Sequence, residues 1–441
     1  MKQDETRNMN SRKNSDFIRI LSNTAWMVFD KVFLLALNLF VSVKIANYYN
    51  ALGYGSYQYA VSVVAVIEII TTFIDGRIVK KKYMGCDPDV VVVTATVTRI
   101  LLAAVSVLVG TVFLFVYAGD VQFSVIFFLL LLNMALGNLK FGMVNRFEYL
   151  LKSRKVVVAS DLAALAAAVL QLFAVSFHWP LTSLAPIALT STVISTVIVT
   201  RQYRAEFGGK GLKLMDWKLF RTMLQESFPL AVAFACGTIY NRCDSIMLGA
   251  MMTYAQVGIY SIAASLLNVV QIAISPIRES VYPKLLSLYD TDREEYARCY
   301  VRISSAMTWI YIVGVAFSFF ILPYLFRFLN EEYAEAFPVY RVLVLGTFFM
   351  YNAALRAGHF TVIGKGKLLT YSQAVSVVVN IVLNLVGIRL WGMYGAALAT
   401  VITQAVSLWF FNLFFEEGRE VFRWQLKALD PLHIIGFLKM I

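Results

Sequence analysis

Charged residues, cysteine, proline and histidine are all scarce in this chain. Only 15% of its 441 residues are charged, whereas a typical soluble domain has about 25%. Its four cysteines include no CxxC pair, so neither a disulfide framework nor a zinc site is indicated. The sequence also lacks a Walker motif, an HExxH metalloprotease motif and a nucleophile elbow. These absences exclude most classes of soluble enzyme, and we expect neither enzymatic activity nor an organic cofactor.

A cleavable leader is another feature that the sequence does not show. The first 22 residues are polar and charged, without a short apolar core or a small-residue cleavage site. Long extracytosolic loops are missing as well, and the longest that we expect is 327–337. Such a loop leaves no room for a catalytic domain, which weighs against a membrane glycosyltransferase or polymerase.

Apolar residues are what the chain has in excess. They make up 59% of the sequence and form about twelve runs of about 20 residues. A helix needs about 20 apolar residues to cross a hydrocarbon core of about 30 Å. We therefore predict an all-α polytopic membrane protein with about twelve transmembrane helices. The expected spans are 24–46, 57–76, 90–117, 121–143, 156–177, 181–200, 227–250, 257–277, 303–325, 338–362, 368–389 and 393–415.

The net charge of +12 follows the predicted topology. Thirty of the 39 Lys and Arg residues lie in the termini and in the alternate loops of one side, against about three in the loops of the other side. Because positive charge is retained on the cytosolic side, both termini are predicted to be cytosolic. The basic face can attract anionic membrane lipid. The charge therefore gives no reason to expect a nucleic-acid partner.

Two parts of the chain carry the same short pattern. The sequence G-x-Y-x-x-A-x-S begins at Gly55 and again at Gly258, an offset of 203 residues. Parallel repeats of this kind build two-lobed transporters with a site between the lobes. We expect a cytosolic N-terminal tail at 1–22, an N-lobe of six helices at 23–200, a cytosolic linker with an amphipathic segment at 201–226, a C-lobe of six helices at 227–415 and a cytosolic C-terminal tail at 416–441.

Three basic residues lie at a similar depth in the inner half of the predicted spans: Lys31, Arg99 and Arg356. Ionisable groups inside a membrane are costly and usually face a cavity or a partner. Arg binds phosphate through two parallel hydrogen bonds, and Lys binds it as a point charge. The three residues are therefore candidates for an anion-binding cavity. The alternatives are snorkelling to the cytosolic interface and an intramembrane ion pair, such as Lys31 with Asp30 or Glu68.

A second set of polar residues lies in the outer half of the membrane. Asp244 belongs to the seventh span and Thr400 to the twelfth. Asn380 and Asn384 share one face of the eleventh span, because they are four residues apart. Carboxylate, amide and hydroxyl oxygens suit a small hard cation, so the set is a candidate ion site. The alternative is a polar helix-packing cluster in which Asp244 pairs with a cation such as Arg242.

Several short motifs, in this order and spacing, resemble a known family over almost the whole chain. The family is that of the oligosaccharide-lipid flippases (Wzx type), in the multidrug/oligosaccharidyl-lipid/polysaccharide exporter superfamily. The motifs are Asn23 and Trp26; the run from Ala46 to Ala60; Ser227-x-Pro229; Asp244-x-x-Met247-Leu248-Gly249; Val257 to Ala263; Gly364-Lys-Gly-Lys; Asn380-x-x-Leu383-Asn384; and Gly392 to Thr400.

The resemblance implies two six-helix lobes that alternate between inward-open and outward-open states. It implies transport of an undecaprenyl-pyrophosphate-linked oligosaccharide from the cytosolic to the outer leaflet of the bacterial inner membrane, for O-antigen, capsule or exopolysaccharide assembly. Polysaccharide polymerase and chain-length proteins would be partners. Cationic cavity residues would hold the pyrophosphate, for which Lys31, Arg99 and Arg356 are the candidates here.

The related lipid II flippases imply a sodium site between helices seven, eleven and twelve. Asp244 matches its carboxylate, Asn380 and Asn384 match its pair on helix eleven, and Thr400 matches its threonine. The departure is Asn384, where an aspartate would be expected. The sequence therefore leaves open whether sodium or a proton is the coupling ion.

Three other functions remain open from the sequence. One is a multidrug or metabolite exporter working as a cation antiporter on the same fold, which a cavity dominated by carboxylates would favour. The second is the membrane glycosyltransferase or polymerase, which would need a paired-carboxylate or long outer loop. The third is a non-transporting scaffold, which has little need of buried cations.

Overall fold

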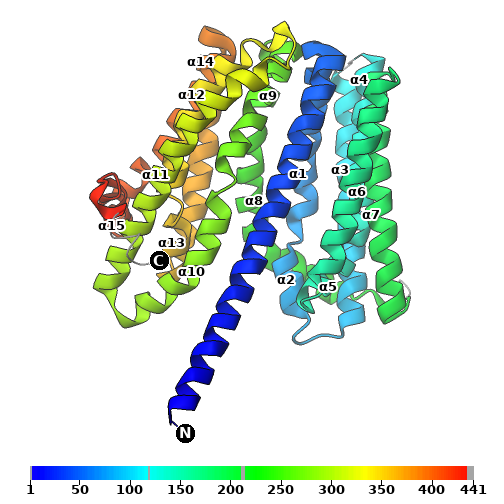
Figure 1. The fold of residues 1–441 in the computed structure, drawn as a ribbon. Coiled ribbons are helices and arrows are strands. Elements are labelled where there is room, and N and C mark those ends of the chain that lie inside the picture. Colours follow the sequence, from blue (N-terminus) through cyan, green and yellow to red (C-terminus); the bar gives the residue numbers. More distant parts are fainter. Residues whose placement is uncertain (1, 118–119, 210–213, 435–441) are drawn as a thin grey trace.

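The structure is a computed structural model that describes residues 2–117, 120–209 and 214–434, with side chains from residue 34 onward. Regular structure in these residues is entirely helical (Figure 1). The α-helices are α1 (Lys2–Ile67), α2 (Gly76–Lys82), α3 (Pro88–Tyr117), α4 (Val121–Gly137), α5 (Phe141–Tyr149), α6 (Ser153–Ser176), α7 (Leu184–Phe207), α8 (Trp217–Met251), α9 (Tyr254–Gln271), α10 (Ile274–Thr291), α11 (Arg293–Phe326), α12 (Ala336–Asn352), α13 (Arg356–Val362), α14 (Lys367–Leu408) and α15 (Glu416–Lys427). The 3₁₀ segments are η1 (Glu68–Phe73), η2 (Asn138–Lys140), η3 (Leu181–Ser183), η5 (Glu331–Tyr333) and η6 (Phe410–Phe414).

The predicted all-helical membrane fold is confirmed. Nine segments of the described chain are long and apolar enough to cross a membrane. Two of them reverse direction, α1 at Asn50 and α14 at Gly392, and so cross twice. The more polar α8 adds a further crossing, since its 35 residues span roughly 50 Å. Twelve crossings result, as the hydrophobic runs predict.

The first reversal depends on the conformation of one asparagine. Asn50 has φ 57° and ψ 176°, and a positive φ is uncommon for residues other than glycine, although Asn adopts it more often than most. Its side-chain oxygen accepts a hydrogen bond from the backbone N–H of Gly53 at 3.0 Å, which caps the descending half of α1. The hairpin therefore needs no separate loop.

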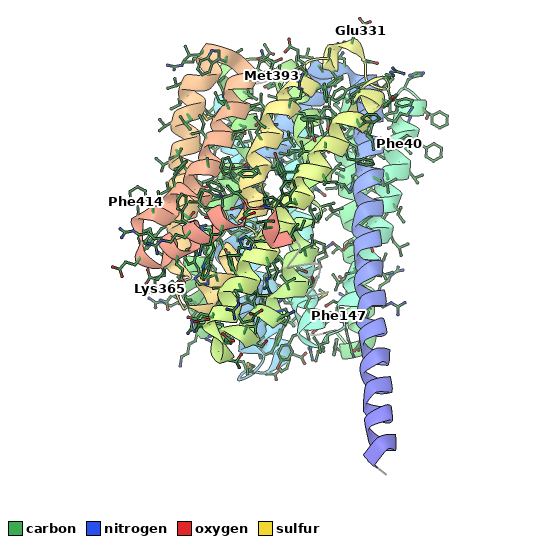
Figure 2. The ribbon with its side chains drawn as sticks, turned by 60° about the vertical axis from the view of Figure 1, so that its left-hand side comes forward. Phe40, Phe147, Glu331, Lys365, Met393 and Phe414 are labelled. Carbon is green, nitrogen blue, oxygen red and sulfur yellow. The ribbon has the colours of Figure 1, made fainter. Side chains whose placement is uncertain are left out.

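The helices form two lobes that lie side by side (Figure 1). The N-lobe contains α1–α7 and the C-lobe contains α8–α14, with α15 on the flank of the C-lobe. Figure 2 shows Glu331 and Met393 at the end opposite the N-terminus, and Phe147 and Lys365 toward the N-terminal end. We call these the outer and inner ends, following the predicted topology. Large apolar side chains such as Phe40 and Phe414 project outward, as lipid-facing residues must.

The two lobes are joined at the outer end. The backbone N–H of Asn330 donates to Asn47 Oδ1 at 3.0 Å, and the Asn330 side chain donates to the Asn47 carbonyl at 2.9 Å. Tyr333 donates from its hydroxyl to the Ala46 carbonyl at 3.1 Å. These contacts link η5 and the residue before it to α1, so the outer end is closed in this conformation.

Helix α8 also contacts the N-lobe near the inner end. The backbone N–H of Asp75 donates to Ser227 Oγ at 3.0 Å, and the rings of Phe73 and Phe228 stack with centroids 6.0 Å apart. The expected amphipathic segment within 201–226 forms the first turns of α8, which begin at the N-cap Asp216. The fold therefore fixes the start of the C-lobe to the wall of the N-lobe.

The expected C-terminal tail contains a helix that packs on the protein. In α15, Val421, Trp424 and Gln425 are buried against the C-lobe. Gln425 accepts a hydrogen bond from Asn412 at 3.0 Å through its side-chain oxygen, and its backbone carbonyl accepts from Asn352 at 3.1 Å. Helix α15 is therefore part of the lobe's structure.

Candidate functional site

A cavity of about 1100 Å³ lies between the two lobes. The N-lobe contributes residues from α1, η1 and α3, and the C-lobe contributes residues from α8, α9, α12 and α14. The lining is rich in polar side chains, among them Gln58, Glu68, Arg99, Arg242, Asn268 and Gln271. A cavity with walls from both lobes can change its exposure when the lobes move relative to each other.

Arg99 is the predicted cation that lines this cavity. Its Nη1 donates to Thr71 Oγ1 at 2.8 Å and to Asn138 Oδ1 at 3.4 Å. Its guanidinium lies 4.0 Å from the centroid of the Phe141 ring, which holds the side chain by a cation–π contact. Its Nε has no hydrogen-bond partner among the described residues. The guanidinium is thus held in place while keeping capacity to bind an anion.

Arg356, the second predicted cation, does not join Arg99 in the cavity. Arg356 is buried at the start of α13, where its Nε donates to Asn412 Oδ1 at 2.7 Å and its guanidinium lies near the rings of Phe360 and Phe411. It does not belong to the described lining of the main cavity. Lys31 lies outside the residues whose side chains the structure describes.

The four residues of the predicted ion site do come together. Asp244 is buried on α8 and accepts hydrogen bonds from Asn384 at 2.7 Å and from Thr400 at 2.6 Å. Asn384 also donates to Asn380 Oδ1 at 3.1 Å. The sequence missed the fifth member, Tyr260, whose hydroxyl donates to Asp244. Tyr260 is the tyrosine of the second G-x-Y motif, which is the signal that could have revealed it.

The cluster can hold either a cation or a proton. Asn384 Oδ1 is buried and accepts no hydrogen bond from the described residues. A sodium ion could use this oxygen with the carboxylate of Asp244 and the hydroxyl of Thr400, because hydroxyl groups rotate to present their lone pairs. Without a cation, the three donors stabilise the charge of Asp244, whereas burial disfavours that charge and a bound proton would remove it.

Arg242 is a second functional candidate that the sequence analysis did not place in the cavity. It was considered there only as a partner of Asp244, two residues further along α8. Both residues line the cavity, but they do not pair: Asp244 accepts its hydrogen bonds from Tyr260, Asn384 and Thr400. No acidic partner of Arg242 is present among the described residues. The two-residue spacing was the available signal against this pairing, because side chains at i and i+2 of a helix do not face each other.

Solved structures of membrane transporters align with this chain over most of its length. The lipid II flippase MurJ, in an inward closed conformation, aligns with a TM-score of 0.66 and 13% identity over 93% of this chain and 92% of that one. An inward-facing multidrug resistance transporter of the MATE family, from the MOP superfamily, aligns with a TM-score of 0.65 and 13% identity over 92% and 95%. These TM-scores establish a shared fold, and identities this low leave the substrate undetermined.

Sequence comparison finds two relatives in archaea. The first is 24% identical over 192 residues to an uncharacterized membrane protein of Methanocaldococcus jannaschii, covering 44% of this chain and 45% of that protein. The second is 21% identical over 224 residues to the probable low-salt glycan biosynthesis flippase Agl15 of Haloferax volcanii, covering 50% and 47%. The matched part thus spans less than half the length of either relative.

A family model for polysaccharide biosynthesis proteins matches residues 20–289. That region covers more than half of the chain and contains the N-lobe from residue 20 onward, α8, α9 and most of α10. It therefore includes Arg99, Arg242, Asp244 and Tyr260. The chain is a multi-pass membrane protein that belongs to the polysaccharide biosynthesis protein family.

Proposed function

We propose that this protein flips an undecaprenyl-pyrophosphate-linked oligosaccharide repeat unit from the cytosolic to the outer leaflet of a bacterial inner membrane. The family and its fold support a transporter of lipid-linked glycan. The repeat unit would serve the assembly of O-antigen, capsule or exopolysaccharide. A polymerase and chain-length proteins would act on the unit after it reaches the outer leaflet.

The observation that carries the proposal is a cavity lined by guanidinium groups from both lobes. Arg99 comes from α3 and Arg242 from α8, and each has hydrogen-bonding capacity that the described residues do not use. Two guanidinium groups, each able to donate two parallel hydrogen bonds, suit a pyrophosphate, which carries several negatively charged oxygens. Amides such as Gln58 and Gln271 can bind sugar hydroxyls beside it.

The buried cluster around Asp244 would couple this transport to an ion gradient. Asp244 lies two residues beyond Arg242 on α8, so movement of one residue moves the other. Binding of sodium or a proton at Asp244 would favour one orientation of α8 and so change the exposure of the cavity. Drug or metabolite export on the same fold is the alternative. The carboxylates of Glu68, Asp75 and Asp244 also line this cavity and favour a cationic substrate, whereas Arg99 and Arg242 favour an anionic one.

Deletion of the gene in its host tests the proposal. Lipid-linked oligosaccharide should accumulate on the cytosolic leaflet, where a membrane-impermeant oxidant added to intact cells cannot reach its sugars. The wild-type gene should restore access to the oxidant and the surface polymer, and an Asp244→Asn gene should not. Unchanged intermediates and normal surface polymer, in a strain without a second flippase, would contradict the proposal.

A further inference from the structure

A second cavity, of about 390 Å³, lies within the N-lobe next to the main one. Its walls come from α1, η1, α4, η2 and α7, together with Arg242 of α8. Glu68 and Arg242 line both cavities, so the two spaces meet at these side chains. We call this second cavity the side pocket.

The side pocket combines hydrogen-bonding groups with apolar surface. Asn133, Asn138 and Thr192 supply amides and a hydroxyl, and Leu130 and Met134 supply apolar contacts. The Oδ1 atom of Asn133 is buried and accepts no hydrogen bond from the described residues. A buried polar atom left in this state costs free energy and calls for an explanation. A ligand hydroxyl that donates to Asn133 provides one.

The lining discriminates between the parts of a lipid-linked oligosaccharide. An isoprenoid tail would leave Asn133 and the charges of Glu68 and Arg242 without hydrogen bonds, at a cost in free energy. Of the two arginines proposed to bind the pyrophosphate, Arg99 lines the main cavity and is not part of the side pocket, so the main cavity suits the pyrophosphate better. A sugar ring has hydroxyls that both donate and accept, and its C–H faces can pack on Leu130 and Met134. The pocket therefore suits a sugar.

We infer that the side pocket binds the first sugar of the lipid-linked substrate, the one bonded to the pyrophosphate. The inference rests on the proposed function. Because this sugar is joined directly to the pyrophosphate, its pocket must adjoin the pyrophosphate site. The side chain of Arg99, in the main cavity, donates to Asn138 of the side pocket at 3.4 Å, and Arg242 belongs to both spaces. Asn133 and Thr192 then determine which first sugar is accepted.

The test compares two ligands on purified protein in detergent. One is the lipid-linked oligosaccharide extracted from the host, and the other is undecaprenyl pyrophosphate without sugar. The variant Asn133→Leu with Thr192→Val should bind the sugar-bearing lipid about tenfold more weakly than wild type, since hydrogen bonds are lost. Its affinity for undecaprenyl pyrophosphate should be unchanged, which also shows that the variant is folded. Thr190→Val, at an exposed site on α7, is the matched control.

Three outcomes would overturn the inference in different ways. If the double variant binds each of the two ligands as tightly as wild type does, no sugar enters the pocket. Equal weakening for both ligands would assign these residues to the fold or the pyrophosphate site. A sodium-dependent thermal stability that is lost only in the double variant, with sugar binding intact, would make the pocket an ion site. Wild-type protein that binds neither lipid would instead contradict the proposed function, and the inference with it.

Discussion

Gly55 of α1 and Gly258 of α9 lie against each other across the boundary between the two lobes. A β-carbon added at Gly55 would lie 1.7 Å from the carbonyl oxygen of Tyr254 and 2.7 Å from the Gly258 nitrogen. One added at Gly258 would lie 2.4 Å from the carbonyl oxygen of Ala51. These are the first residues of the two G-x-Y-x-x-A-x-S motifs, so the repeated pattern meets itself at the interface.

This contact predicts that Gly258→Ala opens the outer end. The methyl group would collide with backbone atoms, which cannot move aside as a flexible side chain can. Cysteines introduced at positions 47 and 330 should form a disulfide in the parent protein and should do so several-fold more slowly when Gly258→Ala is added. Gly314→Ala is the control, because nothing lies within 4 Å of its added β-carbon. An unchanged rate would show that the lobes part elsewhere.

Replacing Asn384 with aspartate should raise the affinity for sodium about tenfold, since a second carboxylate joins Asp244 at the site. Without sodium, the two like charges should lower the stability of the variant. Thermal unfolding of the purified protein over a sodium chloride series measures both effects, with potassium chloride as the control for ionic strength. A sodium-independent unfolding temperature in both wild type and variant would favour a proton as the coupling ion.

The two arginines Arg99 and Arg356 should respond differently to substitution. Arg99→Gln should abolish binding of undecaprenyl pyrophosphate while leaving the unfolding temperature near that of wild type. Arg356→Ala should lower the stability by about 1–3 kcal/mol, because it leaves Asn412 Oδ1 buried without its donor. Binding titrations and thermal unfolding separate the two effects. If the Arg356→Ala protein is stable but does not bind undecaprenyl pyrophosphate, Arg356 belongs to the substrate site.

The docking of α15 gives a further prediction. Gln425→Ala should destabilise the C-lobe by about 1–3 kcal/mol, because Asn412 loses the side-chain oxygen that its amide donates to. Arg423→Ala, an exposed position on the same helix, should have little effect. Thermal unfolding monitored by tryptophan fluorescence compares them, since Trp424 lies in the contact. Equal stability of both variants would show that α15 contributes little to the lobe.

The sequence was sufficient to predict the fold and the grouping of the ion-site residues. Hydrophobic length gave the number of crossings. Asn380 and Asn384 share a helix face because they are four residues apart. Counting residues along straight helices put Asp244 and Thr400 at the same depth in the membrane as Asn384. The predicted grouping held because α8 is unbroken at Asp244 and because the reversal of α14 at Gly392 falls between Asn384 and Thr400, where the sequence analysis had placed the loop between two spans.

The same counting failed for Arg356. It treats 338–362 as one straight helix, whereas α12 ends at Asn352 and α13 begins at Arg356. A break of this kind redirects every side chain after it, so depth no longer indicates which way the arginine points. Tyr260 was missed for another reason. It belongs to the G-x-Y-x-x-A-x-S motif that begins at Gly258, which indicated a repeat and gave no sign that the tyrosine hydroxyl donates to Asp244.

The double attachment of α8 has a consequence for recombining homologous proteins. Its first turns are bonded to the N-lobe through Ser227 and Phe228, whereas Asp244 is bonded to helix α14 of the C-lobe. A chimera spliced in the connecting segment before Trp217 would pair the start of α8 with a foreign surface. Pro229 lacks the amide hydrogen that would donate to the preceding turn of the helix. A splice point at Pro229, inside α8, therefore leaves both sets of contacts intact when the halves of two homologues are exchanged.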